Sequence, residues 1–324
     1  ALVLAALTTV PLAFSLVSGD QALGMRQAEC VALLLAAGLP LSRLAVPRGI
    51  QVNEALVITA LAFILSPLFS AYAFNANDIP FLDALFEAIS GVTTTGLSTL
   101  ASVEDKPHAF LFARAWLQWY GGLGIVVLSV ALLSGHQVAS RRLIDPETAS
   151  EDLITNTRTH ARRVFIAYGT LTALGLAAAL ALPIEPFAGM AHVLSAVSTG
   201  GFSTYDDSLA GFGSSAAASL FALLSFLGAI SLPLYYLTFM RGWRPLAEDV
   251  ELPALAVAVL LAAAVLTGLL VAAGRPGGEA PYQGPSSGVI SPTTPRFSTL
   301  PPAHACPVPT SPIRFALCLQ RSHA

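Results

Sequence analysis

Thr93-Thr94-Thr95-Gly96-Leu97-Ser98-Thr99 returns 105 residues later in altered form, as Ser198-Thr199-Gly200-Gly201-Phe202-Ser203-Thr204. Each copy follows an apolar stretch, 81–92 or 187–197, that is too short to cross the roughly 30 Å hydrocarbon core of a bilayer. A fixed spacing of about 100 residues indicates duplication of a supersecondary unit. Because irregular backbone at membrane depth survives only inside protein or beside water, the repeat predicts two re-entrant helices that end in functional loops.

The composition is that of an integral membrane protein. Hydrophobic residues make up 55% and charged residues 11%, and the mean hydropathy is +0.70. The net charge of −3 offers no nucleic-acid-binding surface. Seven stretches are long enough, or nearly so, to span a bilayer: 1–17, 27–44, 52–74, 110–134, 162–182, 216–240 and 252–273.

The distribution of basic residues predicts the orientation. One set of loops holds nine of them, Arg43, Arg48, Arg141, Arg142, Arg158, Arg162, Arg163, Arg241 and Arg244, and the alternating set holds only Arg26 and Lys106. The richer set is predicted to be cytoplasmic. Both Thr/Gly phrases then face the outside, near six acidic residues: Asp78, Asp83, Glu104, Asp105, Asp206 and Asp207.

The phrase suits coordination of a dehydrated monovalent cation. A potassium ion that sheds its water needs oxygens in place of the hydration shell, and a row of backbone carbonyls supplies them. Such a row needs positive φ at some residues, which glycine reaches at little steric cost, while threonine adds a hydroxyl. The bland alternative is that the small residues only let helices pack closely. Two copies in register favour the ion path.

These residues carry a resemblance. The two phrases, together with Arg114-Ala115-Trp116-Leu117-Gln118-Trp119-Tyr120-Gly121-Gly122-Leu123-Gly124 after the first, resemble the Trk/Ktr/HKT superfamily of potassium transporters, most of all bacterial TrkH, over roughly residues 1–273. The resemblance implies an all-α integral membrane fold of repeated helix–pore-helix–helix units with re-entrant filter loops, like a potassium channel. It implies ion contacts at Thr94, Thr95, Gly96, Thr199, Gly200 and Gly201. Glycine at position 96 favours potassium, since superfamily members with serine there tend to favour sodium.

The resemblance also implies an organisation and partners. Residues 1–44 would be a preceding pair of transmembrane helices, 45–140 the first pore repeat, 141–245 the second, and 246–274 the first helix of a third. The expected function is potassium uptake across the bacterial inner (plasma) membrane, by a homodimer with a cytosolic nucleotide-binding regulatory subunit of the TrkA or KtrA kind. Potassium is the substrate, membrane lipid surrounds the chain, and no cofactor is expected. No enzyme motif is present: there is no HExxH, Gly-x-Ser-x-Gly or carboxylate pair within a span.

From about residue 275 the character changes. The segment 275–324 is rich in proline and glycine and is interpreted as an aberrant tail, from a truncation or altered reading frame after about residue 274. Thr293 and Thr294 align with Thr93 and Thr94 as a weak trace of a third loop, with Arg296 at the position of Gly96. The alternative function is therefore a non-conducting, truncated membrane fragment of such a transporter.

Three further features attract simpler interpretations. Glu87, inside the first short apolar stretch, is predicted to face water or a neighbouring donor rather than to set the potential of a pore mouth. Arg114, near the outer end of a span, is predicted to extend its side chain to the interface. The histidines show no ligand spacing and are predicted to be ordinary loop or helix-end residues.

Overall fold

The computed structural model describes residues 1–43, 52–142, 149–244 and 249–272. Within these ranges there is no strand, and the predicted all-α class is confirmed. The helices are α1 Leu2–Ser18, α2 Gln21–Ser42, α3 Val52–Phe74, α4 Phe81–Val92, α5 His108–Arg142, α6 Ala149–Leu180, α7 Pro186–Val197, α8 Ser215–Ala229, α9 Leu232–Arg241 and α11 Glu251–Ala272, with short 3-10 turns η1 Asn75–Asn77 and η2 Ser208–Phe212. Four stretches of the described residues are long and apolar enough to cross a membrane: Gln21–Ser42, Val57–Asn77, Arg162–Leu180 and Glu251–Leu269.

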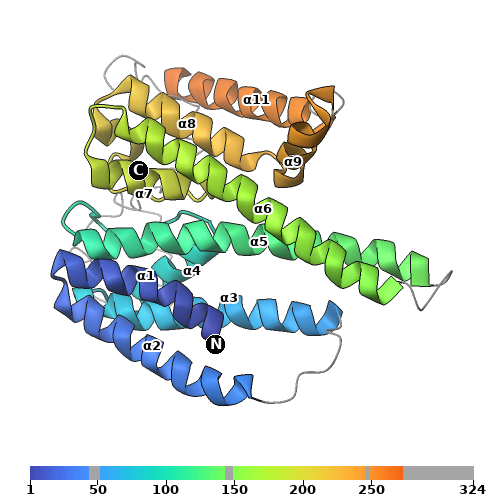
Figure 1. Ribbon diagram of the computed structural model, residues 1–324. Coiled ribbons are helices and arrows are strands. Elements are labelled where there is room, and N and C mark those ends of the chain that lie inside the picture. Colours follow the sequence, from blue (N-terminus) through green and yellow to red (C-terminus); the bar gives the residue numbers. More distant parts are fainter. Residues whose placement is uncertain (44–51, 143–148, 245–248, 273–324) are drawn as a thin grey trace, which may run out of the picture. The chain divides into compact units, whose positions relative to one another are not determined.

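The first two helices pack against each other as a hairpin (Figure 1). Gly19 turns the chain in a left-handed conformation, with φ 79°, and the Asp20 carboxylate caps α2 by accepting from the Leu23 amide at 3.1 Å. The helix therefore begins well before residue 27, where the sequence predicted it. Arg26 lies within its first turns and donates to the Tyr72 carbonyl at the end of α3.

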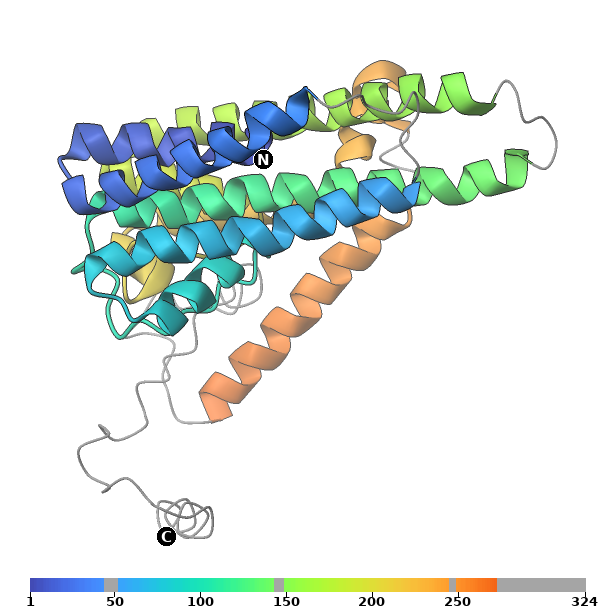
Figure 2. The same ribbon diagram turned by 90° about the horizontal axis from the view of Figure 1, so that it is seen from below.

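The first Thr/Gly unit consists of α3, the short helix α4 and α5. Helix α4 has the predicted bounds, and its small residues Ala84 and Ala88 are fully buried against α3 and α5. In Figures 1 and 2, α3 and α5 lie side by side. Helix α5 also contacts the second short helix, α7. It therefore lies between the two short helices and is in reach of both loops.

The second unit repeats this order with α6, α7 and α8, but one prediction for it is wrong. The stretch 216–240 is not one helix, because α8 ends at Ala229 and α9 starts at Leu232. Ile230 between them is extended, with ψ 140°. Pro233 is the reason: it lacks the amide that would bond the Ala229 carbonyl and is tolerated only in the first turn of a new helix.

In each unit, a glycine lets the helix that follows the loop pack closely on the end of the short helix. A Cβ on Gly121 of α5 would collide with the carbonyl of Val92, the last residue of α4. A Cβ on Gly228 of α8 would collide with the carbonyl of Val197, the last residue of α7. Val92 and Val197 are equivalent in the repeat, so the two units share one packing contact as well as one order of helices.

Candidate functional site

We call residues 93–100 the first Thr/Gly loop and residues 198–205 the second. Each loop leaves its short helix through the same hydrogen-bonded turn. In the first, the amides of Thr94 and Thr95 donate to the carbonyls of Gly91 and Ser90, at 3.0 and 2.9 Å. In the second, Thr199 and Gly200 donate to Ala196 and Ser195, both at 2.9 Å. This is the Schellman arrangement, which ends a helix through one left-handed residue.

The left-handed residue is threonine in both loops. Thr94 and Thr199 each have φ 55°. Glycine is the usual residue at this position, and a β-branched side chain there is an outlier that stores on the order of 1–3 kcal/mol of strain. Both loops thus carry threonine, rather than glycine, at the strained position.

One glycine in each loop also has positive φ, as the sequence predicted: 77° at Gly96 and 81° at Gly201. The two loops meet here, because a Cβ on Gly96 would collide with the Gly200 carbonyl oxygen. Thr94, Thr95 and Thr199 lie in the same two turns, next to this contact. The predicted trace at Thr293 and Thr294 lies outside the described residues.

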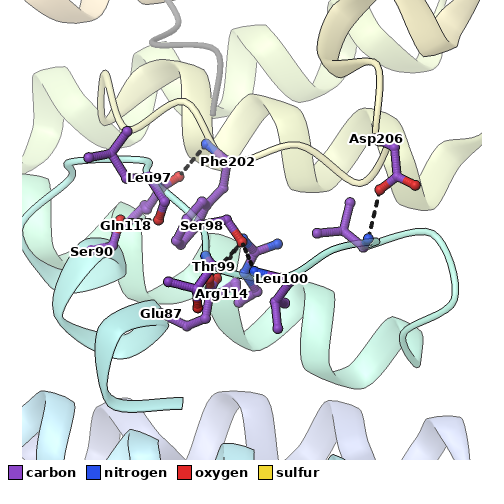
Figure 3. Close-up of polar contacts among 11 residues, drawn as sticks. Glu87, Ser90, Leu97, Ser98, Thr99, Leu100, Arg114, Gln118, Phe202 and Asp206 are labelled. Atoms are coloured by element: carbon purple, nitrogen blue, oxygen red, sulfur yellow. Dashed lines mark hydrogen bonds and ion pairs between the residues drawn. The ribbon is translucent and has the colours of Figure 1, made fainter. Parts of the chain in front are cut away.

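Glu87 of α4 holds the second half of the first loop. Its Oε1 accepts from the Ser98 hydroxyl at 2.6 Å and from the Thr99 amide at 2.9 Å (Figure 3). Its Oε2 lies 2.7 Å from Nη2 of Arg114. The two side chains are 0% and 2% exposed, so Glu87 has its neighbouring donors but does not face water. The prediction that Arg114 extends to the interface is wrong, because its guanidinium lies inside the protein, with its charge partner.

His192 of α7 does the same for the second loop. Its Nδ1 lies 2.8 Å from the Ala188 carbonyl, which can only accept, so Nδ1 carries the proton. Its Nε2 then accepts from the Ser203 hydroxyl, at 3.0 Å. The ring is buried beside Phe212 and Phe221, with centroid distances of 4.6 and 5.3 Å.

Two residues one turn apart on α5 reach across to the second loop. The Phe202 amide donates to Oε1 of Gln118 at 3.1 Å, and Gln118 leaves no room for a side chain on Gly200. The guanidinium carbon of Arg114 lies 3.9 Å from the centre of the Phe202 ring. A cation this close to a ring face is attracted by the negative quadrupole of the ring. The second loop is therefore held in part by side chains from a helix of the first unit.

Acidic residues connect the segments that follow the loops. The Val103 amide donates to Oδ1 of Asp206 at 2.7 Å (Figure 3). The Asp206 amide in turn donates to Oε1 of Glu104 at 3.1 Å. Burial, then the negative charges of Glu185 and Glu104, raise the pKa of Tyr205 nearby. Asp206 and Glu104 therefore link the two segments through hydrogen bonds to backbone amides.

The described part of the site has no cluster of metal-binding side chains. Among the described residues no group of three or more His, Cys, Asp or Glu side chains could hold a metal ion. What the loops offer is backbone carbonyls and threonine hydroxyls, the ligands of a weakly held monovalent cation.

Sequence reasoning missed Arg114, Gln118, Asp206 and His192 as residues that hold the loops. The prediction that the histidines are ordinary loop or helix-end residues is wrong for His192, which is buried inside α7. A signal existed for Arg114, because an ionisable residue within an apolar helix is by default a functional hypothesis whose partner should be sought. Gln118 gave no such signal, since a polar residue one turn from a charge is common on helix surfaces.

Comparison with known proteins follows this geometry. A family model described as TrkH, cation transport protein, matches residues 32–246. The Trk system potassium uptake protein TrkG of Escherichia coli is 30% identical over 214 residues, which cover 63% of this chain and 44% of TrkG. The Trk system potassium uptake protein TrkH of Halomonas elongata is 31% identical over 255 residues, which cover 75% of this chain and 52% of that protein.

The fold has a solved counterpart. The crystal structure of the potassium transporter TrkH from Vibrio parahaemolyticus matches with a TM-score of 0.70 and 23% sequence identity, over 90% of this chain and 62% of that one. The integral membrane, all-α fold is thereby confirmed. The chain spans about half the length of the curated relatives it matches.

Proposed function

The chain belongs to the TrkH family of cation transport proteins, and from that premise we propose that it is the ion-translocating subunit of a Trk-type potassium uptake system. The observation that carries the proposal is the pair of identical turns that end in a strained threonine, Thr94 and Thr199. A packing element would not need to keep the same strained residue twice. A row of coordinating oxygens would, because its spacing depends on these torsion angles.

The proposed ion contacts are Thr94, Thr95 and Gly96 in the first loop, with Thr199, Gly200 and Gly201 in the second. Each short helix ends at its loop, so the partial negative charge of its carboxyl end favours a cation there. The names of the relatives support potassium as the ion, since TrkG and TrkH are Trk system potassium uptake proteins. These names describe transporters, and we propose that the chain likewise moves its substrate without covalent chemistry.

The setting of this function is also part of the proposal. We place the chain in the bacterial inner membrane, with both Thr/Gly loops towards the outside, because basic residues concentrate in the opposite set of loops. Residues 45–140 and 141–245 would form two pore repeats. A homodimer and a cytosolic nucleotide-binding regulatory subunit are proposed from the family resemblance.

Uptake of radioactive rubidium, a potassium analogue, tests the function. The chain is expressed in a potassium-uptake-deficient bacterial host, and uptake is measured with potassium or sodium as competitor. We expect uptake that potassium suppresses more strongly than sodium. Met25→Leu, a substitution at an exposed position on α2, is the control variant and should leave uptake unchanged. Binding of potassium to the purified chain without any uptake would instead support the alternative, a non-conducting membrane fragment. Absence of both would reject the proposal.

A further inference from the structure

Equivalent residues hold the two Thr/Gly loops. Glu87 and His192 are 105 residues apart, and so are the serines they bind, Ser98 and Ser203. The correspondence includes the next hydrogen bond, because each serine oxygen also accepts from the amide two residues on, at 3.2 Å in the first loop and 2.9 Å in the second. A polar side chain inside the short helix is therefore the common anchor of both loops.

The residue that faces the anchor differs between the units. Gly121 and Gly228 are 107 residues apart and set the register of α5 against α8. In that register Arg114 corresponds to Phe221. Arg114 pairs with Glu87 through charge, whereas Phe221 packs on the ring of His192. The second unit thus shows that a neutral pair is sufficient to hold the serine of its loop.

The ion pair of the first unit needs a further reason. A fully buried pair loses most of the solvation of both charges, and a well-packed neutral pair of similar size is often as stable. Arg114 makes a cation–π contact that a neutral phenylalanine at this position could not make: its guanidinium covers the ring of Phe202 in the second loop. Glu87 likewise holds a backbone amide of the first loop, that of Thr99. The pair therefore touches both loops at once.

We propose that Glu87 and Arg114 are positioning residues that couple the two Thr/Gly loops, so that the ion-selecting geometry of the second loop depends on a charge anchored in the first. Gln118 supports the same coupling one turn along α5, through the Phe202 amide. The selectivity part of this inference rests on the proposed function. The coupling itself is a property of the protein without any ion.

The test uses the natural difference between the units. Glu87→His combined with Arg114→Phe transfers the neutral pair of the second unit into the first. Its matched control is Arg26→Phe, which removes another arginine from above an aromatic ring, that of Tyr72 at 5.3 Å, away from the loops. Glu87→Gln with Arg114→Met is a second variant, should the first fail to fold.

Hydrogen exchange in choline chloride measures the coupling. We expect the amides of 202–205 to exchange at least about tenfold faster in the double variant, a change that corresponds to about 1.4 kcal/mol, although no residue of the second loop has been altered. Arg26→Phe should leave them unchanged. Unchanged exchange at 202–205 in a folded double variant would overturn the coupling.

The selectivity part is measured by thermal unfolding in increasing concentrations of potassium or sodium. The midpoint for each ion is the concentration that gives half of the maximal rise in the unfolding temperature. We expect the ratio of the two midpoints to fall by about tenfold in the double variant, and Arg114→Lys to restore part of it when Glu87 is kept. An unchanged ratio in a folded variant would make the pair purely structural. If the unaltered chain shows no response to potassium, the proposed function fails, while the exchange measurement in choline still decides the coupling.

Discussion

Gly96 lies against the carbonyl oxygen of Gly200, so closely that a Cβ on Gly96 would collide with that oxygen. The two residues belong to different Thr/Gly loops and come together because α4 and α7 both pack on α5. A change at Gly96 is therefore transmitted to the second loop by direct contact. The sequence alone indicated only a demand for positive φ at this residue.

Gly96→Ser should lower potassium-over-sodium selectivity. Serine at φ 77° costs about 1–2 kcal/mol in backbone strain, and its Cβ must also displace the Gly200 carbonyl, a proposed ion ligand. Competition of potassium and sodium against rubidium uptake measures the selectivity.

Gly19→Ser is the matched control for this substitution. Gly19 has nearly the same torsion angle, φ 79°, but a Cβ there meets nothing within 4 Å. It carries the strain without the collision, so it should lower the thermal stability slightly and leave selectivity unchanged. Equal selectivity in both variants would contradict the assignment of Gly96 to the ion path.

Thr94 should respond unusually to truncation. At an ordinary helical site alanine is more stable than glycine, but in a left-handed conformation the order reverses. Thr94→Gly should therefore have a free energy of unfolding about 1 kcal/mol higher than Thr94→Ala, and Thr199 should show the same order. Chemical unfolding in detergent measures this difference. Both changes should impair selectivity, because both remove the hydroxyl; normal selectivity in both would exclude the hydroxyl as a ligand.

Asp206→Ala should loosen the link between the segments that follow the two loops. Val103 is buried, and its amide would lose its acceptor, which costs about 1–3 kcal/mol. Hydrogen exchange at Val103 should rise by about tenfold or more. Asp105→Ala removes an equal charge from an exposed neighbouring position and should have no such effect. The same rise in both variants would point to charge rather than the hydrogen bond.

The orientation can be tested with impermeant thiol reagents in intact cells. In a background without Cys30, Cys306 and Cys318, a cysteine introduced at the exposed Asp105 should react from outside. A cysteine introduced at Glu151 should react only after the membrane is permeabilised, because it lies beside the arginine-rich set of loops. Labelling at Glu151 in sealed cells would place the Thr/Gly loops on the cytoplasmic side.

The short helices could be predicted because their boundaries are local. An apolar run that stops at a Thr/Gly phrase gave the bounds of α4 and, within one residue, of α7. The break at Ile230 and Ser231 was equally local, since Pro233 is a stop signal. It was missed because average hydropathy over 216–240 remains high on both sides of the proline.

The holding contacts could not be predicted in the same way. Nothing in one sequence shows that Arg114 meets Glu87, since the two lie on different helices and their distance depends on how α4 packs on α5. Thr94 and Thr199 are a second case. Propensity places positive φ at glycines, as Gly96 and Gly201 have it, and gives no reason to expect it at a β-branched residue as well.

The two units differ in the number of residues between the loop glycine and the glycine of the following helix, and this difference has a consequence for protein engineering. From Gly96 to Gly121 the chain has two residues fewer than from Gly201 to Gly228, and the second unit includes the 3-10 turn η2 on the way. The segment between the loop and the following helix thus differs in length between the two units, although both keep the same glycine contact with the short helix. Gly213, at the end of η2, has φ 58° and open space around it. An epitope tag or fluorophore-binding peptide inserted there should reach the solvent without moving the backbone carbonyls of the two Thr/Gly loops. It would label the protein for single-molecule measurements.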